Sequence, residues 1–457
     1  MQPHNFVDRR SELELLEELW SKGGGLGIVY GRRRIGKTRL LLKWIEEKPH
    51  VYYQAGFYSH DINLQGLARA FEEYLGIEGL SKVKFSSLDV LLEHTLRMWR
   101  GKLVVVIDEI TYWVRSYPGV VSEIQRFVDH VLSGFQAVIV LTGSIVGVVT
   151  RDLVGGGSPL FGRARLRIRL GELLPWCLPY FLPRYSSSGL VEAYSLVGGI
   201  PHYLVEWSDE REPLNAYLHM FAPGGVLEDE PLMILREEVR NPSPYVSIVR
   251  AIAEGMRTIG RVSNYTGLPL GHVSRYLSTL IQLGLVGYEP LVPRRRKRRL
   301  LAIHDRLLKS YYTIIEPYRH ILSTRPDRIP GSLRDRYKAV IAEGWERLAS
   351  HHALTQLAPQ LGIAVSEAGK LVHKGYEVDY VVVDSGNRRV LAVEAKWSPL
   401  DKREIQGIAR ETMAKVHRVL PGYDVTVALY VREASESNLD NAIIVTPEDL
   451  PWKRDCR

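Results

Sequence analysis

Short apolar runs alternate with amphipathic stretches along the first third of the chain. The runs at residues 27–30, 51–53, 103–107 and 138–141 are bounded by polar residues or glycine. Apolar residues between the runs recur every three or four positions, which is the period of a helix. Continuous apolar runs of this length are typical of strands in a parallel sheet covered by helices. We therefore expect an α/β domain over residues 1–175.

A different pattern follows the closely spaced prolines Pro175, Pro179 and Pro183. Residues 176–241 have helical periodicity without a strand-like run, and we expect them to form a helical lid.

Residues 242–310 predict a winged helix. The third helical stretch, over residues 272–283, is ended by Gly284 and followed by two short apolar runs with a basic stretch between them. Three helices followed by a two-stranded wing are typical of domains that place their recognition helix in a DNA groove. Arg275 lies among the polar positions of that helix. Winged helices also serve as protein-contact modules, so the partner stays open at this point.

The strand and helix pattern returns after a polar linker at residues 325–330. Residues 325–457 predict a separate α/β domain, in which residues 376–383 and 390–396 form a hairpin around a Ser-Gly-Asn turn.

Composition is ordinary for a globular protein, with 45% hydrophobic and 25% charged residues among 457. No apolar run reaches the length of about 18 residues that a membrane helix needs. The first residues lack the pattern of a secretory signal, and we expect a cytoplasmic protein without membrane contact. The two cysteines, Cys177 and Cys456, are far apart in sequence, which supports neither a disulfide framework nor a zinc site. We expect both to be chemically inert.

The net charge of +8 is concentrated in one run of six cations within the expected wing. The run consists of Arg294, Arg295, Arg296, Lys297, Arg298 and Arg299. A solvated surface is the usual interpretation of a charge run, but like charges this dense repel one another and favour a polyanion. Beside a helix-turn-helix pattern, the run indicates contacts with DNA phosphates.

Residues 31–38 read GRRRIGKT and match the phosphate-binding loop G-x-x-x-x-G-K-[ST] at every fixed position, between an expected strand and an expected helix. Backbone N–H groups of such a loop surround phosphates, the lysine reaches the outer phosphates, and the threonine hydroxyl can hold Mg²⁺. We therefore expect ATP or ADP with Mg²⁺ as the ligand. The expected binding residues here are Gly31, Arg34, Gly36, Lys37, Thr38 and Arg39.

Two further strands end in residues suited to nucleotide hydrolysis. The strand over residues 103–107 is followed by Asp108, which can hold Mg²⁺ through water, and by Glu109, which can polarise the attacking water. The strand over residues 138–141 leads to Ser144, whose hydroxyl would lie near the γ-phosphate. A plain polar turn is the alternative interpretation of Ser144.

In their order along the chain, these motifs resemble those of the archaeal ATPases of the STAND branch of the AAA-like P-loop NTPases. The shared landmarks are residues 6–13, Tyr30 with the arginine-filled loop, Val51-Tyr52-Tyr53, Asp108-Glu109, Thr142-Gly143-Ser144, residues 159–163 and Gly198-Gly199-Ile200-Pro201. The resemblance implies that Pro201 lies against the adenine and that Arg9 lies beside the nucleotide base. A helix-breaking turn is the alternative role of Pro201.

The C-terminal hairpin carries Asp379, Glu394 and Lys396. Glu394 and Lys396 are two residues apart, so their side chains leave the same face of the strand, and Asp379 on the neighbouring strand can meet them. Two carboxylates can hold Mg²⁺ or Mn²⁺, while the ammonium can orient water and offset charge on a phosphate. The set is suited to phosphodiester cleavage; a surface ion pair between Glu394 and Lys396 is the alternative.

This set resembles the core of the PD-(D/E)xK nucleases, with Val378 in place of the proline. The resemblance implies a restriction-endonuclease-like fold, a further metal-binding acid on an upstream helix, either Glu346 or Glu343, and Gln406 on the helix that follows.

The predicted fold class is therefore α/β: a P-loop NTPase parallel sheet with a helical lid, a winged-helix domain, and a C-terminal restriction-endonuclease-like α/β domain. The predicted function is a Mg²⁺-dependent ATPase coupled to DNA binding and metal-dependent DNA cleavage. Catalytic roles are expected for Lys37, Glu109, Asp379, Glu394 and Lys396. One alternative is an ATP-switched DNA-binding or signalling protein with an inactive nuclease-like domain; another is an ATP-driven protein-remodelling factor. A homo-oligomer is compatible with all three.

Overall fold

A computed structural model of the chain describes residues 6–99, 101–293, 299–324, 330–435, 438–439, 442–454 and 456. The chain divides into two compact units, which are described separately. One comprises Val7–Leu173 with Ile200–His202, and the other comprises Leu174–Gly199 with most of Tyr203–Cys456. No helix within the described ranges is both long enough and apolar enough to cross a membrane.

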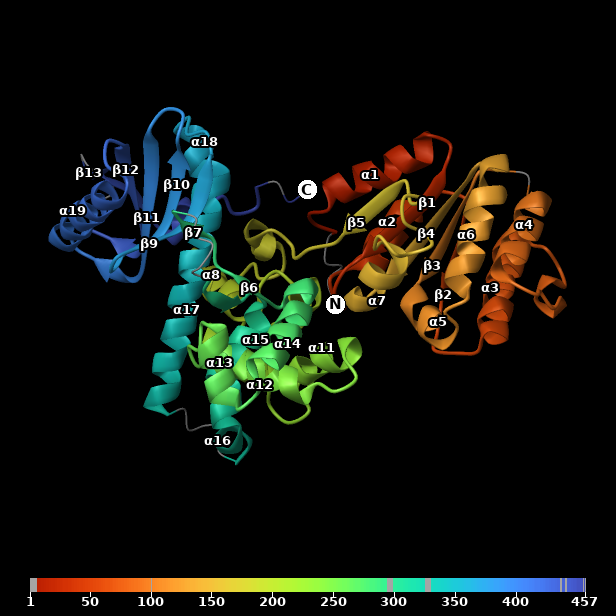
Figure 1. The fold of residues 1–457 in the computed structure, drawn as a ribbon, viewed down its shortest axis with the longest axis horizontal. Coiled ribbons are helices and arrows are strands. Elements are labelled where there is room, and N and C mark those ends of the chain that lie inside the picture. Colours follow the sequence, from red (N-terminus) through yellow and green to blue (C-terminus); the bar gives the residue numbers. More distant parts are fainter. Residues whose placement is uncertain are drawn as a thin grey trace. The chain divides into compact units, whose positions relative to one another are not determined.

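The first unit is built on a five-stranded parallel sheet with the strand order β2-β3-β4-β1-β5 (Figure 1). The strands are β1 (Gly25–Tyr30), β2 (His50–Gln54), β3 (Leu103–Asp108), β4 (Ala137–Gly143) and β5 (Leu166–Arg169). The helices are α1 (Arg10–Ser21), α2 (Lys37–Ile45), α3 (His60–Leu75), α4 (Leu88–Trp99), α5 (Ile110–Ser116), α6 (Val120–His130) and α7 (Val146–Val148). Every residue of β3 and β4 is buried, which confirms the parallel sheet that the continuous apolar runs predict.

The register of this sheet brings three strand ends to one edge. Tyr30 at the end of β1 pairs with Gly143 at the end of β4, and Ile107 near the end of β3 pairs with Leu141 in β4. The phosphate-binding loop after β1 and the acids that follow Ile107 therefore lie at the carboxyl edge of the sheet, where parallel α/β sheets bind ligands.

The second unit begins with a short 3₁₀ segment (Pro175–Tyr180) and continues in helices. These are α8 (Ser187–Val197), α9 (Pro201–Val205), of which residues 201–202 are grouped with the first unit, α10 (Pro213–Met220) and α11 (Glu230–Glu238). This stretch contains the helices that its periodicity predicts.

A winged helix follows, as predicted. It consists of α12 (Ser243–Ala253), α13 (Ile259–Thr266), α14 (Leu270–Leu283), β6 (Val286–Tyr288) and β8 (Leu301–Ile303). Helix α14 buries Val273, Leu277 and Leu280, and β6 pairs antiparallel with β8 as the wing. Helices α15 (Arg306–Ser310) and α16 (Arg319–Thr324) come next.

The wing also joins the C-terminal sheet, which its sequence does not predict. Strand β7 (Leu291–Val292) lies between β6 and β8 in sequence and pairs in parallel with β9 (Glu367–His373), Leu291 opposite Lys370. The resulting seven-stranded sheet has the order β13-β14-β12-β11-β10-β9-β7. The winged helix and the C-terminal domain therefore share backbone hydrogen bonds.

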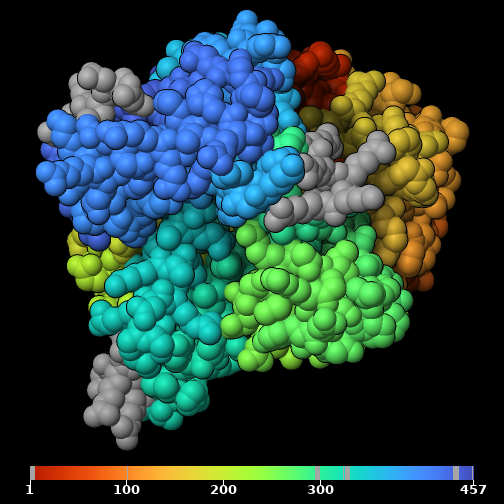
Figure 2. Space-filling view, turned by 60° about the vertical axis from the view of Figure 1, so that its left-hand side comes forward, coloured from red at the N-terminus to blue at the C-terminus, as the bar shows by residue number. Residues whose placement is uncertain are grey.

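The C-terminal domain contains the predicted hairpin, because β10 and β11 pair antiparallel. The hairpin strands are β10 (Tyr376–Asp384) and β11 (Arg389–Leu400). The other elements of the domain are β12 (Asp424–Ala434), β13 (Asn438–Leu439), β14 (Ala442–Val445), α17 (Gly331–His352), α18 (Ala358–Gln360) and α19 (Lys402–Val419). Helix α19 covers one face of the sheet and α17 covers the other (Figure 1). Helix α19 contributes Ile405, Ala409 and Val416 to the core of the domain, and the ring of Trp345 on α17 lies 5.4 Å from the ring of Trp397. Figure 2 shows this domain in blue, next to α17 in teal.

Cys177 and Cys456 form a disulfide, so the expectation that both are inert is wrong. Both cysteines are fully buried. The C-terminal tail folds back on the 3₁₀ segment: the Lys453 N–H donates to the Trp176 carbonyl at 2.7 Å, and the Trp452 and Trp176 rings lie 5.9 Å apart. The sequence separation of 279 residues conceals this pairing, because only the tertiary fold brings the two segments together.

Candidate nucleotide site and carboxylate cluster

The phosphate-binding loop has the backbone shape that its glycines allow. A side chain on Gly31 would place its Cβ 2.5 Å from the Leu170 carbonyl oxygen, so only glycine fits there. Gly36 has φ of 96° and caps α2 without a side-chain hydrogen bond. The N–H groups at the start of α2 therefore have no side-chain cap competing for them, which suits an anionic phosphate.

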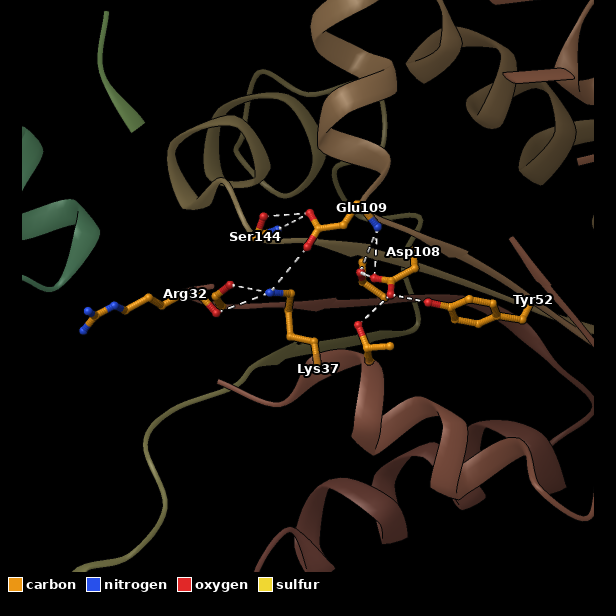
Figure 3. Close-up of polar contacts among 9 residues, drawn as sticks. Arg32, Lys37, Tyr52, Asp108, Glu109 and Ser144 are labelled. Atoms are coloured by element: carbon orange, nitrogen blue, oxygen red, sulfur yellow. Dashed lines mark hydrogen bonds and ion pairs between the residues drawn. The ribbon is translucent and has the colours of Figure 1, made fainter. Parts of the chain in front are cut away.

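Lys37 is buried, with 5% of its surface exposed, and its ammonium lies over the loop. Its Nζ donates to the carbonyl oxygens of Gly31 at 3.1 Å and Arg32 at 3.3 Å. The same Nζ lies 3.9 Å from Glu109 Oε1 (Figure 3). The ammonium is thus held between the loop and the carboxylate expected to polarise water.

Asp108 is fully buried at the end of β3 and accepts three side-chain hydrogen bonds. Thr38 Oγ1 donates to Oδ2 at 2.7 Å, and the Tyr52 hydroxyl donates to Oδ2 at 2.6 Å. Thr142 Oγ1 donates to Oδ1. Burial and the Asp108 carboxylate raise the pKa of Tyr52, which keeps this hydroxyl a donor. The two oxygens expected to hold Mg²⁺, on Thr38 and Asp108, are therefore in direct contact, a donor set that fits the ion.

Neither Tyr52 nor Thr142 is predicted as a site residue, although both lie in segments that carry the family resemblance. Their position in the sequence could have indicated this role, because Tyr52 and Thr142 place a hydroxyl near the carboxyl ends of β2 and β4, the strands that flank β3 in the sheet.

Glu109 is held by the strand end next to it. Its Oε2 accepts hydrogen bonds from the Ser144 N–H at 3.1 Å and from Ser144 Oγ at 2.7 Å. Its backbone has φ of 53°, a left-handed conformation that is rare for residues other than glycine. Such conformations persist where surrounding contacts enforce them, often at functional sites. Ser144, expected near the γ-phosphate, orients the Glu109 carboxylate in this structure (Figure 3).

The other expected nucleotide residues lie around the same loop. The buried Arg9 guanidinium donates to the carbonyl oxygens of Gly171 at 2.6 Å and Ile35 at 3.4 Å, so it supports the loop. The Pro201 ring lies 3.9 Å from the point where a Gly36 Cβ would stand. Arg34 has a left-handed backbone within the loop, and Arg39 is exposed on α2.

The C-terminal domain brings its three expected residues together. Lys396 Nζ lies 3.1 Å from Glu394 Oε2 and 3.6 Å from Asp379 Oδ2. The Ala395 N–H donates to Asp379 Oδ2 at 3.0 Å, which fixes that carboxylate against β11. Glu394 is 5% exposed, whereas the Lys396 side chain is 43% exposed, so the pair joins a buried carboxylate to an ammonium that solvent reaches.

Two acids in this cluster resist ionisation. Burial, followed by the charge of Asp379, raises the pKa of Glu394 to about 7 and that of Glu346 to about 7. Burial lowers the pKa of Lys396, but the charges of Asp379 and Glu394 outweigh burial and raise it. A divalent cation would relieve the repulsion between these carboxylates, so their chemistry fits a metal.

Glu343, the other candidate for the helical acid, is engaged elsewhere. Its carboxylate lies 2.9 Å from Arg306 Nη1 and 2.7 Å from Lys309 Nζ. Burial raises the pKa of Glu343, but these two cations outweigh burial and lower it. Of the two candidates, the geometry therefore favours Glu346. Gln406 lies half-buried in the first turns of α19. Across the described ranges, no three His, Cys, Asp or Glu side chains converge as a metal-binding group.

Two cavities flank the cluster. The larger, of about 830 Å³, is lined by α8, α10, α17 and the strand segments around Lys396 and Arg432. The smaller, of about 260 Å³, lies between the wing and the C-terminal domain and is lined by His304, Lys370 and Asp379 among others. Glu346 lines both cavities, so the cluster forms part of the wall between them.

The expected DNA-binding residues are described only in part. Arg275 is exposed on α14, with its guanidinium 5.3 Å from the Tyr276 ring centre. Arg299 is exposed, 5.2 Å from the Tyr288 ring centre. Arg294, Arg295, Arg296, Lys297 and Arg298 lie outside the described residues.

Family models match three segments of the chain. A family model described as an ATPase domain predominantly from Archaea matches residues 6–207. The matched segment contains the phosphate-binding loop, Asp108 and Glu109. An IclR helix-turn-helix domain model matches residues 246–290, and a model of archaeal and bacterial proteins of unknown function matches residues 311–408. The chain thus carries an ATPase domain, for which bound nucleotide with Mg²⁺ is expected, and a helix-turn-helix of a DNA-binding type.

Individual proteins are similar to this chain over different shares of its length. An uncharacterized protein of Methanocaldococcus jannaschii is 26% identical over 458 aligned positions, covering 97% of this chain and all of the relative. An uncharacterized ATP-binding protein of the same organism is 52% identical over 44 residues, 9% of this chain and 75% of the relative. A solved Walker-type ATPase of Pyrococcus abyssi has a TM-score of 0.52 and 20% identity, covering 67% of this chain and 95% of that one, a similarity of fold.

Proposed function

We propose that this chain is a Mg²⁺-dependent ATP switch that controls DNA binding by its winged helix and phosphodiester cleavage by its C-terminal domain. The observation that carries the cleavage proposal is the contact of the Lys396 ammonium with both Asp379 and Glu394. A partly exposed ammonium that contacts two largely buried carboxylates on adjacent strands can reach a phosphate in solvent while it stays held by both acids.

At the nucleotide site, each side chain has a separate task. The backbone N–H groups of residues 31–38 and the Lys37 ammonium would bind the phosphates, and Thr38 with Asp108 would hold Mg²⁺. Bound Mg²⁺ would neutralise charge on the phosphates. Glu109, oriented by Ser144, would accept a hydrogen bond from the attacking water and take up its proton.

At the carboxylate cluster, Asp379, Glu394 and Glu346 would hold a divalent cation, which supplies charge neutralisation for the scissile phosphate. Lys396 would orient the attacking water and offset negative charge that develops on the phosphate oxygens. The pKa of Glu346 and of Glu394 is about 7, so near neutral pH these carboxyl groups would release protons when a cation binds.

A cleavage assay on the full chain tests both sites. Purified protein with Mg²⁺ or Mn²⁺ is expected to cut DNA, and Asp379→Asn and Lys396→Met, which keep the side-chain volume, are expected to abolish cutting. Lys37→Ala should remove ATP binding, while Glu109→Gln should keep binding and lose hydrolysis. Cutting that is unchanged in the Asp379 and Lys396 variants would refute the proposed nuclease site.

One observation favours a second candidate, an ATP-switched DNA-binding protein without cleavage. The Lys396 ammonium already contacts both Asp379 and Glu394, and within the described ranges no three metal-binding side chains converge. This candidate predicts salt-sensitive DNA retention, ATP hydrolysis, and intact DNA after incubation with either metal.

A further inference from the structure

We infer that the larger cavity beside the carboxylate cluster is a binding channel for a single strand of nucleic acid. The inference rests on the proposed cleavage function for its biological meaning, but its physical basis is the lining of the cavity. Helix α17 forms one wall, helices α8 and α10 contribute to the lining, and the ends of β11 and β12 complete it. All of these elements lie in one compact unit.

Helix α17 places two cations along the approach to Glu346. Arg334, Lys338, Ala342 and Glu346 are spaced four residues apart, and all four line the cavity. At about 1.5 Å of rise per residue, Lys338 lies about 12 Å and Arg334 about 18 Å along the helix from Glu346. The two cations can therefore contact several successive phosphates of a strand that ends at the cluster.

These two cations are available for an anion. Arg334 and Lys338 are exposed, and neither makes an ion pair with another described residue. Arg336 on the same helix differs, because its guanidinium lies 2.9 Å from Glu254. The small side chain of Ala342 leaves the path between Lys338 and Glu346 unobstructed.

An aromatic platform stands at the other end of the channel. Trp397 is half-buried, its ring packs edge-on against the buried Trp345 at 5.4 Å, and the Arg432 guanidinium lies 5.8 Å from its centre. A tryptophan face beside a guanidinium is suited to stacking with a base of any sequence, the arrangement that single-strand binding proteins use.

Charge and size favour one strand over a duplex. The charged lining residues are Arg334, Lys338, Lys396, Arg432, Glu192, Glu212 and Glu346. Burial raises the pKa of Glu192 and outweighs the opposite effect of the Tyr337 hydroxyl, which donates to it at 2.6 Å, so this acid opposes an anion less than a free carboxylate does. The cavity encloses about 830 Å³ and is lined by three helices, a space for part of one strand and not for a duplex, whose major groove alone is about 12 Å wide.

Binding without cleavage tests this channel independently of the nuclease proposal. Fluorescence anisotropy in chelator compares a fluorescein-labelled single-stranded oligodeoxynucleotide with the blunt duplex of the same sequence, on the full chain. Trp397→Ala should weaken single-strand binding about tenfold, Trp397→Phe should restore most of it, and both should leave duplex binding unchanged. A thermal melt confirms that each variant is folded.

The two cations are tested by the salt dependence. Arg334→Gln with Lys338→Gln should lower the slope of log affinity against log salt by about 1.4 for the single strand. The matched control, Arg403→Gln with Arg410→Gln, removes two exposed cations from α19, outside the cavity.

Equal losses for strand and duplex would overturn the single-strand assignment, and unchanged single-strand binding in both the Trp397→Ala and the cation variants would overturn the channel. Intact channel binding together with uncut DNA would refute the cleavage proposal and leave the channel standing.

Discussion

Reduction of the Cys177–Cys456 disulfide should destabilise the second unit by an amount set by the loop that it closes. The bridge joins residues 279 apart. In the chain-entropy description, closing a loop of this length restricts the unfolded chain by about 5 kcal/mol at 25 °C. Both cysteines are fully buried, so two thiols can occupy the same apolar site as small hydrophobic groups. The native contacts are then largely retained, and most of the loss comes from the unfolded state.

Guanidinium unfolding followed by tryptophan fluorescence measures this loss. Trp176 and Trp452 lie beside the bridge, with ring centres 5.9 Å apart, so they report on the tail and the segment that it covers. With a denaturant dependence of about 5 kcal/mol per molar, the loss of about 5 kcal/mol lowers the midpoint of that transition by about 1 M. The nucleotide unit is followed separately by its response to ATP, because the chain is not a single two-state system.

The control is Cys456→Ser, which should unfold at the reduced midpoint and show no further change when reductant is added. A midpoint that stays unchanged while thiol titration counts two free thiols would refute the loop-closure reasoning. Two free thiols in the unreduced, denatured protein would refute the disulfide itself.

Three further outcomes are expected. Tyr52→Phe removes one of the hydrogen bonds to Asp108, which should lower the free energy of unfolding by about 1.5–3 kcal/mol. The substitution should also lower ATP hydrolysis more than ATP binding, and unchanged hydrolysis would contradict the role of Tyr52 in holding Asp108. Folding raises the pKa values of Glu346 and Glu394 from 4.5 to about 7, so between pH 4.5 and 7 the folded state binds more protons than the unfolded state. The free energy of unfolding of the metal-free protein should therefore fall as pH rises from about 4.5 to 7. Glu346→Gln should flatten this dependence of unfolding free energy on pH, measured by chemical unfolding. Arg9→Ala removes the hydrogen bonds that tie the loop carbonyl of Ile35 to the Gly171 carbonyl after β5, and it should weaken ATP binding measured by calorimetry. Arg10→Ala, which removes an exposed cation one residue away, should not.

The main elements of both domains follow from local patterns. The continuous apolar character of residues 103–107 predicts a buried strand. The spacing of glycine, lysine and threonine in residues 31–38 predicts the loop, because phosphate binding requires that spacing. The hairpin that holds Asp379 opposite Glu394 also follows from alternation and a short turn. These signals depend on neighbours in sequence, so no knowledge of the tertiary fold is needed.

The sequence does not predict which distant residue contacts a given site residue. Tyr52 approaches Asp108 only because β2 pairs with β3 in one particular register, Gln54 opposite Asp108. The choice between Glu343 and Glu346 likewise depends on which acid meets Arg306 on a distant helix. Position on one helix cannot decide it, since both acids belong to the same few turns of α17.

The sequence by itself determined the ATPase domain, the helix-turn-helix and the residue types of both candidate sites, because periodicity and motif spacing act over short stretches of chain. The tertiary structure alone decided that the tail is bridged to Cys177, that β7 of the wing completes the C-terminal sheet, and that α17 lines one cavity together with α8, α10 and the ends of β11 and β12. Each of these depends on segments far apart in the chain being packed together. Their positions follow from burial of the whole core, and no local pattern encodes them.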